Sequence, residues 1–163
     1  MRDEKVMLIT NELQPGDLGQ IVMQHGLLYA NEHGYDFTFE AYVAEPLAQF
    51  ARRNNPREKI WLVKKGGQVV ASICICEVSE DTAQLRWFFV SSEARGLGLG
   101  KQLVESALNF CNSTGYKEVI LWTVKGLEAA KSLYLRNGFT LQQEIEHEVW
   151  GAMQVEQRYG KTF

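Results

Sequence analysis

The stretch Arg95-Gly96-Leu97-Gly98-Leu99-Gly100 decides the fold of this chain, because it places three glycines at alternate positions between an apolar strand and an amphipathic helix. Glycine leaves the backbone bare where the chain turns from strand to helix. The first amides of the helix then point outward at the positive end of the helix dipole. A phosphate reaches these amides without meeting a side chain. The stretch therefore predicts a binding site for a phosphorylated ligand.

Spacing excludes two other phosphate-binding loops. A Walker A loop ends in Lys-Ser or Lys-Thr, whereas Lys101 is followed by Gln102. A dinucleotide fingerprint that starts at Gly96 needs its third glycine at the position that Lys101 occupies. The helix also comes late in the chain, with no βαβ unit at the N-terminus. Neither a nucleoside triphosphatase nor a dinucleotide-binding enzyme is expected.

Two motifs resemble those of the Gcn5-related N-acetyltransferase (GNAT) superfamily. The first is Arg/Gln-x-x-Gly-x-Gly/Ala after a strand, here residues 95–100 after the strand 85–90. The second is Ala-x-x-Leu-Tyr-x-x-x-Gly-Phe, which residues 130–139 match. A strand-like segment, 119–124, lies between them. The resemblance implies an acyl-CoA-dependent N-acyltransferase that moves the acetyl group of acetyl-CoA to a primary amine by direct attack.

Within the superfamily, the chain is most similar to the acetyltransferase domain found fused behind winged-helix regulators of the MarR type. The shared residues are Pro15-Gly16-Asp17-Leu18-Gly19, His25-Gly26, Leu28-Tyr29-Ala30, Glu32, Gly34, Thr38-Phe39-Glu40, Leu121-Trp122-Thr123 and the neighbourhood of Glu146-His147. No winged helix precedes them, so DNA binding is not expected. The net charge of −3 agrees, because nucleic-acid-binding domains are basic.

Length and cysteine usage set the expected organisation. A chain of 163 residues that is 45% apolar predicts one domain, residues 1–163, around a compact core. Cys74, Cys76 and Cys111 are an odd number of cysteines, which favours a reducing compartment. Cys74 and Cys76 fall on one face of a strand, where they fill the core or, alternatively, ligate a metal; core filling is the expected role.

The chain shows no targeting or membrane signal. Residues 1–5, Met-Arg-Asp-Glu-Lys, open no signal peptide, and no apolar run approaches the ~20 residues of a membrane span. A cytoplasmic protein with no membrane partner is expected.

Hydrophobic periodicity and turn residues predict an α/β (α+β) fold. The expected strands are 6–10, 60–63, 69–76, 83–90, 119–124, 139–150 and 153–159, and the expected helices are two between 18 and 50, one from 99 to 111 ended by Gly115, and one over 127–136. Asp17 is a candidate cap for the first helix, and Gly34 and Pro46 are candidate interruptions. The sum is a mixed, largely antiparallel sheet of about seven strands with helices on both faces, which matches the GNAT fold.

The resemblance implies which residues bind acetyl-CoA. The loop amides hold the pyrophosphate, and the strand before the loop splays from its neighbour, so that its free edge pairs with the pantetheine arm and an amide polarises the thioester carbonyl. The implied cofactor-binding residues are Phe88, Phe89, Val90, Arg95, Gly96, Leu97, Gly98, Leu99, Gly100, Lys101 and Ala130. Residues 88–90 also suit an ordinary buried strand, and the two roles are compatible. No metal is expected.

Tyr134, the tyrosine of the second motif, is the implied catalytic residue, and it donates a proton to the departing thiolate. Reference pKa values of ~10 for tyrosine and ~8.5 for a thiol make full transfer uphill by roughly 2 kcal/mol. A hydrogen bond that strengthens as charge develops on sulfur is therefore sufficient.

The chain departs from the family at two positions. Some relatives carry a glutamate base where Gln84 stands, and glutamine cannot accept a proton. Many relatives carry an asparagine that binds the pantetheine arm where Leu127 stands, so one cofactor contact is missing. Candidate bases elsewhere, acting directly or through water, are His25, Glu32, Glu40 and Glu144, although for any single one of them a solvated side chain is the favoured interpretation.

The acceptor amine, from a small molecule or a peptide, is expected between the N-terminal helices and the last two strands. Candidate acceptor-binding residues are His25, Tyr29, Glu32, Glu40 and Gln84. Acids at 32, 36, 40 and 45 lie among aromatic residues at 29, 35, 37, 39 and 42, which suits a cationic amine. Alternatively, the acids face water and the aromatic residues fill the core.

The sequence leaves catalysis, the length of the acyl group and the oligomeric state open. A non-catalytic acyl-CoA sensor that reports to a partner is compatible with Gln84 and Leu127, whereas Tyr134 argues for catalysis. A longer acyl group would need a deeper pocket. A homodimer is also compatible with the strand-rich C-terminus.

Overall fold

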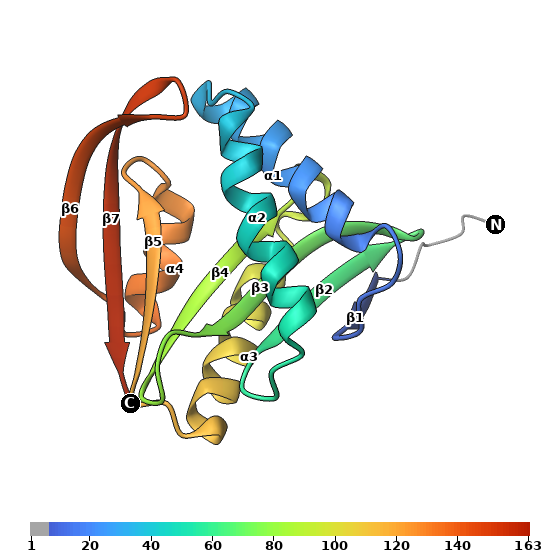
Figure 1. Ribbon diagram of the computed structural model, residues 1–163, viewed down its shortest axis with the longest axis vertical. Coiled ribbons are helices and arrows are strands. Elements are labelled where there is room, and N and C mark those ends of the chain that lie inside the picture. The colour runs from blue at the N-terminus through green and yellow to red at the C-terminus, as the bar shows by residue number, and fades with distance from the viewer. Residues whose placement is uncertain (1–6) are drawn as a thin grey trace.

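The computed structural model describes residues 7–163 and contains one seven-stranded sheet in the order β1-β2-β3-β4-β5-β7-β6 (Figure 1). The strands are β1 (Met7–Thr10), β2 (Lys59–Lys65), β3 (Gln68–Glu77), β4 (Thr82–Val90), β5 (Glu118–Val124), β6 (Thr140–Val149) and β7 (Ala152–Thr162). The helices are α1 (Asp17–His33), α2 (Thr38–Arg53), α3 (Leu99–Thr114) and α4 (Glu128–Arg136), with a 3-10 turn at Ser92–Ala94. Residues 1–6 lie outside the described residues; they include residues 1–5, where no signal peptide is expected, and the first residue of the expected strand 6–10.

Helices cover both faces of the sheet (Figure 1). Apolar residues of α1 and α2, such as Ile21 and Leu47, pack on one face with Leu62 and Cys74. Residues of α3 and α4 pack on the other face with Val63 and Ile73 of the same two strands. This alternation follows from the period of two along a strand. The mixed, largely antiparallel sheet with helices on both faces is confirmed.

The turns explain where the N-terminal helices begin and end. Gly34 takes φ 70° and closes α1, so the joint between the two helices lies there. Pro46 lies inside α2, where it removes one backbone hydrogen bond without ending the helix. Gly16 is the residue that precedes α1, so the expectation that Asp17 caps it is wrong. The Asp17 carboxylate instead pairs with Lys64 Nζ at 2.8 Å.

The only parallel pair of neighbouring strands among residues 7–163 is β4 with β5, and it is short. It joins residues 82–84 to residues 118–120, and beyond Gln84 the two strands diverge (Figure 1). The second half of β4 is therefore paired only with β3, and its other edge offers unpaired backbone groups. This is the splay that the resemblance implies.

A β-bulge at Trp87 changes which side chains of β4 face each helical layer. Trp87 has a φ of 49°, and the β3–β4 register shifts between Ser72 and Cys74. Leu85 packs in the α3–α4 core, whereas Trp87 and Phe89 pack in the α1–α2 core. Without the extra residue these odd-numbered side chains would share one face. The bulge thereby turns Phe88 toward α3 and α4.

The hydroxyl of Ser72 stabilises this bulge, because it donates a 2.6 Å hydrogen bond to the carbonyl of Trp87 in a fully buried position. Replacing Ser72 by alanine leaves that carbonyl without this donor, so Ser72→Ala is expected to lower the free energy of unfolding by about 2 kcal/mol. Urea unfolding measures the change. Ser91→Ala is the control, since the buried Ser91 hydroxyl has no hydrogen-bond partner in the described part of the chain. Equal losses in both variants would contradict this role of Ser72.

Candidate active site

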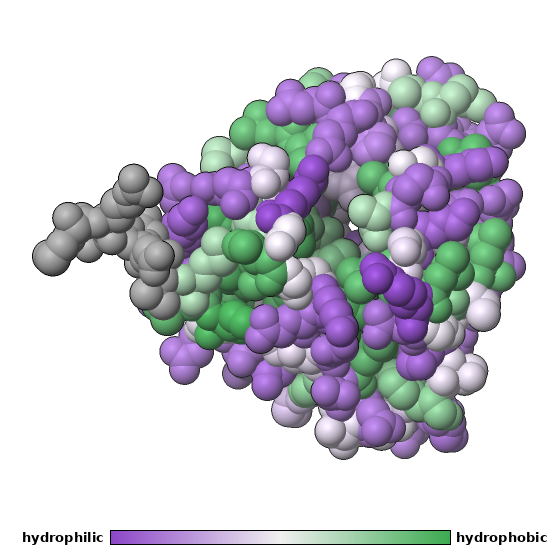
Figure 2. All heavy atoms as spheres, turned by 180° about the vertical axis from the view of Figure 1, so that it is seen from behind, coloured by the Kyte–Doolittle hydropathy of each residue, from purple (hydrophilic) through white to green (hydrophobic). Residues whose placement is uncertain are grey.

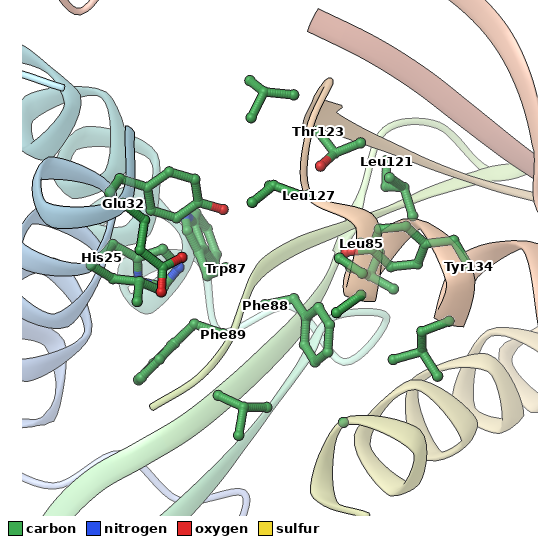
Figure 3. A pocket seen from close by; sticks show the side chains of 18 of the residues that line it. His25, Glu32, Leu85, Trp87, Phe88, Phe89, Leu121, Thr123, Leu127 and Tyr134 are labelled. Atoms are coloured by element: carbon green, nitrogen blue, oxygen red, sulfur yellow. The ribbon is translucent and has the colours of Figure 1, made fainter. Parts of the chain in front are cut away.

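A cleft of about 850 Å³ lies where β4 and β5 diverge. Its walls come from α1, α2, β4, the glycine loop, β5, α4 and β7. From behind, the molecule is hollowed near its centre, with hydrophilic side chains over most of that face (Figure 2). In the close view, Phe88 lies between His25 and Glu32 on α1 and Leu121 and Tyr134 on the far wall, whereas Phe89 lies next to His25 (Figure 3). The cleft thus has one wall from α1 and another from β5 and α4.

Most of the site residues expected from the sequence meet in this cleft. Those that line it are His25, Tyr29, Glu32, Gln84, Phe88, Phe89, Val90, Arg95, Gly96, Gly98, Leu99, Gly100, Lys101, Ala130 and Tyr134. Two expected residues, Leu97 and Glu40, do not line it. Leu97 is 61% exposed on the outer side of the loop. The Glu40 side chain lies against Gly26, where α1 and α2 approach closely.

The glycine loop presents bare backbone to the cleft. Gly96 and Gly98 have φ values of 79° and 75°, and a Cβ at either position would meet no atom within 4 Å. Gly98 precedes α3 without a side-chain cap, so the first amides of this 16-residue helix keep no side-chain acceptor. At Gly100 a Cβ would lie 3.5 Å from Leu133 and Phe88, in ordinary contact. Free amides, open space and the helix dipole together suit an anionic phosphate.

Arg95 ties this loop to the opposite wall. Its Nε donates to the carbonyl of Val90 at 3.2 Å, and its guanidinium pairs with Glu32 at 3.0 Å. Both side chains of the ion pair are more than a third exposed, so the pair contributes little to stability. Its structural effect is to occupy the Glu32 carboxylate, which makes Glu32 a poorer candidate for a free base.

Tyr134 lies on α4 beside the β4 edge. It is 5% exposed and packs against Phe88, Phe139 and Tyr159, with ring centroids 6.2, 5.7 and 6.4 Å away. Burial raises the pKa of Tyr134 well above its ordinary value, with a smaller contribution from Tyr29. The hydroxyl therefore keeps its proton at neutral pH and is suited to donate a hydrogen bond into the cleft.

His25 lies on the opposite wall and is 4% exposed. Its Nδ1 is 2.7 Å from the carbonyl of Ile21, which only accepts, so the ring hydrogen is on Nδ1 and the Nε2 lone pair is free. Within residues 7–163, Nε2 has no hydrogen-bond partner. Burial lowers the pKa of His25 to about 4, although the hydrogen bond to Ile21 opposes the shift. A neutral imidazole thus offers a free acceptor atom at the cleft.

The buried neutral state of His25 makes stability depend on pH. Unfolded His25 takes up a proton near pH 6.5, whereas the folded ring does so near pH 4. Its contribution to stability is therefore complete above about pH 6.5 and is lost as the pH falls toward 4, by roughly 3 kcal/mol in total. Comparing thermal unfolding of the wild type and His25→Gln between pH 4 and 7 measures this loss. The expected stability difference narrows as the pH falls; parallel curves would contradict it.

The other acidic candidates contribute less than the sequence suggests. Glu144 on β6 does not line the cleft, and its carboxylate accepts a 2.7 Å hydrogen bond from Gln157. Of the acids at 32, 36, 40 and 45, only Glu32 lines the cleft. The other three, Asp36, Glu40 and Glu45, are exposed and follow the alternative in which the acids face water. The aromatic residues of this segment nevertheless reach the cleft, in a cluster described below.

Aromatic side chains form the end of the cleft nearest α2. Tyr35 and Phe39 pack on Trp150 with centroids 5.1 and 5.0 Å away, and Tyr42 packs on the same indole at 5.0 Å. We call Tyr35, Phe39, Tyr42 and Trp150 the aromatic cluster; all four line the cleft. Phe37, grouped with them in the sequence, is 78% exposed and lies outside.

Sequence reasoning missed two charged residues of this end, Arg86 and Glu156. Arg86 interrupts an otherwise apolar strand, which is a signal that the sequence does contain. Glu156 carries no such signal, because it is one of three consecutive polar residues, 156–158, in β7. Its position becomes clear only from the pairing of β7 with β5, which places Glu156 beside Val124.

Cys74 and Cys76 fill the core between the sheet and the N-terminal helices. Both are buried, with sulfur atoms 3.8 Å apart. No group of three or more His, Cys, Asp or Glu residues that could hold a metal ion occurs in the part of the chain that the structure describes. The burial of both side chains in the core between the sheet and these helices agrees with the core-filling role.

The sequence and the fold were compared with those of known proteins. A profile of the Acetyltransferase (GNAT) family matches residues 27–139. The chain belongs to this family. An N-acetyltransferase of Schizosaccharomyces pombe is 30% identical over 122 residues, which cover 73% of this chain and 74% of that protein. Rat N-acetyltransferase 8F1 is 36% identical over 90 residues, or 52% of this chain, and the match spans 41% of the rat protein, about two fifths of its length.

Solved structures of GNAT proteins share the fold. An acetyltransferase from Streptococcus agalactiae superposes with a TM-score of 0.80 at 22% identity, covering 96% of this chain and 98% of that one. A ribosomal-protein-alanine N-acetyltransferase from Brucella melitensis gives a TM-score of 0.76 at 17% identity, with 96% and 99% coverage. These likenesses establish the architecture.

GNAT proteins use acetyl-CoA as co-substrate, and the cleft fits such a ligand. No atom lies within 4 Å of where a Cβ would stand at Gly96 or Gly98, so a phosphate has room there, and β4 has an unpaired edge past Gln84. Leu127, where the resemblance implies that one pantetheine contact is missing, lines the cleft with an apolar side chain. None of the helices within residues 7–163 has the length and apolar character needed to cross a membrane.

Proposed function

We propose that this chain is an N-acetyltransferase that moves the acetyl group of acetyl-CoA to a primary amine of a small molecule or peptide. The observation that carries the proposal is the free edge of β4 beside the glycine loop, with Tyr134 on the facing wall. A cleft of this volume suits an extended ligand with a phosphate group at one end.

The residues of the cleft divide the coenzyme contacts between them. The amides from Gly96 to Lys101 hold the pyrophosphate, with Gly98 at the start of α3. The backbone of Phe88, Phe89 and Val90 pairs with the pantetheine arm as an added strand does, and an amide there polarises the thioester carbonyl. Acetyl-CoA supplies an acetyl group that is activated as a thioester.

Two side chains on opposite walls handle the protons. As the C–N bond forms and the C–S bond breaks, the amine nitrogen loses one proton and the sulfur gains one. The Nε2 of His25 accepts the first, directly or through water, because His25, of the four bases expected from the sequence, is the neutral one that lines the cleft and lacks a hydrogen-bond partner on Nε2 in the described residues. Tyr134 donates to the sulfur.

A second candidate function is a non-catalytic acyl-CoA sensor. Gln84 favours it, because the side chain at this position of β4 lines the cleft and cannot accept a proton. The resemblance to domains fused with MarR-type regulators also agrees with a sensor. In either case we place the function in one domain over residues 1–163, and the three free buried cysteines support a reducing compartment such as the cytoplasm.

Thiol release distinguishes the two functions. Purified chain is incubated with acetyl-CoA and a panel of primary amines, and the free thiol is measured with a chromogenic reagent while acetyl-CoA binding is measured by calorimetry. The transferase releases thiol in proportion to acetylated amine, as quantified by mass spectrometry. Tight binding of acetyl-CoA with no thiol release for any amine would favour the sensor.

A further inference from the structure

Arg86 is a half-buried cation at the acceptor end of the cleft, and no carboxylate among the described residues balances its charge. It lies on β4 opposite Cys74, a residue of the α1–α2 core, so its side chain is on the face of the sheet that α2 covers. Its guanidinium carbon lies 4.9 Å from the centroid of the Trp87 ring. Among residues 7–163, no Asp or Glu oxygen lies within the 4.0 Å of an ion pair with Arg86.

One acid, Glu156, also lines this end of the cleft, with a side chain that is 18% exposed. Its carboxylate lies 3.2 Å from His147 Nε2, but this nitrogen forms no hydrogen bond with it and carries a charge only when the ring is protonated. Tyr42 of α2 lies next to this cation: burial raises the pKa of its hydroxyl, Arg86 opposes the rise both by its charge and as a hydrogen-bond donor, and Glu156 adds to the rise. Arg86 thus contacts a neutral hydroxyl and forms no ion pair among the described residues, so its guanidinium, with five N–H groups, keeps donors for an anionic ligand.

The aromatic cluster reaches this cation through Tyr42. Tyr42 and Trp150 pack on each other at 5.0 Å, and Tyr35 and Phe39 complete the wall. Tyr42 is 46% exposed, whereas the other three rings are buried and exclude water on their side, where a charged contact is stronger. They also offer stacking surface to a ring or a large apolar side chain. The end of the cleft therefore combines one anion-binding group with an apolar pocket.

We propose that Arg86 binds the carboxylate of the acceptor, which makes the acceptor a free amino acid with an aromatic or large apolar side chain. The inference rests on the proposed acetyltransferase function and narrows it. A guanidinium matches a carboxylate with two parallel hydrogen bonds, and this geometry fixes orientation as well as affinity. The α-amine is then held at a fixed distance from Arg86, whereas a peptide N-terminus or a polyamine has no carboxylate at that distance.

Three acceptors of one ring size test the proposal: phenylalanine, phenylalaninamide and 2-phenylethylamine. They share the amine and the ring, and only phenylalanine has the carboxylate. The wild type is expected to acetylate phenylalanine with a kcat/KM at least about tenfold above the other two. Arg86→Gln is expected to lose about tenfold or more with phenylalanine and to stay within about threefold with 2-phenylethylamine. Arg52→Gln, the same change on the exposed end of α2, is the control and should match the wild type.

A binding measurement separates this proposal from the proposed function. 3-Phenylpropanoate has the ring and the carboxylate but no amine, so its affinity, measured by calorimetry, does not depend on turnover. The wild type and Arg52→Gln are expected to bind it at least about tenfold more tightly than Arg86→Gln.

Each outcome decides one of the two claims. Equal kcat/KM values for all three acceptors would overturn the assignment of Arg86, and so would an equal loss of kcat/KM in Arg86→Gln with phenylalanine and with 2-phenylethylamine. If none of the three acceptors releases thiol, the protein does not turn over this panel, and a phenylalanine-type substrate is rejected. Binding of 3-phenylpropanoate that depends on Arg86 then still supports the carboxylate site, and binding that is unchanged in Arg86→Gln overturns it.

Discussion

Tyr134→Phe is expected to lose about a hundredfold or more of kcat while acetyl-CoA binding changes by less than about threefold. The substitution removes only the hydroxyl, and the ring keeps its packing against Phe88 and Phe139. General acid catalysis contributes about 10²- to 10⁴-fold, and the hydrogen bond to sulfur strengthens only as charge develops. Thiol-release kinetics give kcat, and calorimetry gives the affinity for acetyl-CoA.

Tyr159→Phe is the matched control for this variant. Tyr159 is also a buried tyrosine in contact with Tyr134, at a centroid distance of 6.4 Å, but it does not line the cleft. Its hydroxyl forms a 3.4 Å hydrogen bond with Gln157. Tyr159→Phe should therefore keep turnover near the wild-type value. If Tyr134→Phe loses as much affinity for acetyl-CoA as it loses kcat, Tyr134 is not the proton donor.

The second large effect is expected at the glycine loop. Gly98→Ala places a Cβ in the open space over the amides of α3 and forces alanine into a φ of 75°. The strain is expected to cost about 1 kcal/mol of stability, and the affinity for acetyl-CoA is expected to fall at least about tenfold. Calorimetric titration with acetyl-CoA measures the affinity, and urea unfolding measures the strain.

Gly16→Ala isolates the effect of the strain. Gly16 also precedes a long helix, with a φ of 93° and no atom within 4 Å of a Cβ, but it does not line the cleft. Both variants should lose similar stability, and only Gly98→Ala should lose affinity for the coenzyme. If both variants bind acetyl-CoA as the wild type does, the glycine loop is not the phosphate site.

Local patterns were enough to predict the elements of this fold. Gly66 and Gly67 have φ values of 58° and 79°, as a tight hairpin requires, and Gly115 ends α3 with a φ of 91°. The apolar spacing from Leu99 to Cys111 matches the buried face of α3. At Pro46 the local rule failed, because packing of Val43, Leu47 and Phe50 against the sheet holds α2 together across the proline.

The end of the cleft at the aromatic cluster could not be predicted in the same way, because its residues meet only through long-range pairing. Trp87 changes the facing of β4 through a bulge that depends on the register with β3. Glu156 and Trp150 reach the cleft because β7 pairs with β5. The acids at 36, 40 and 45 shared a segment with the aromatic residues, but the rotation of the helix and its N-terminal turn place them outside the cleft.

The central claim is that the free edge of β4 and the glycine loop together hold the coenzyme. Hydrogen–deuterium exchange with and without acetyl-CoA tests it most directly, because exchange reports protection of individual backbone segments. Acetyl-CoA is expected to slow exchange in residues 85–90 and 96–101 and to leave the hairpin at Gly66 and Gly67 unchanged. Binding of acetyl-CoA without protection of these two segments would contradict the account.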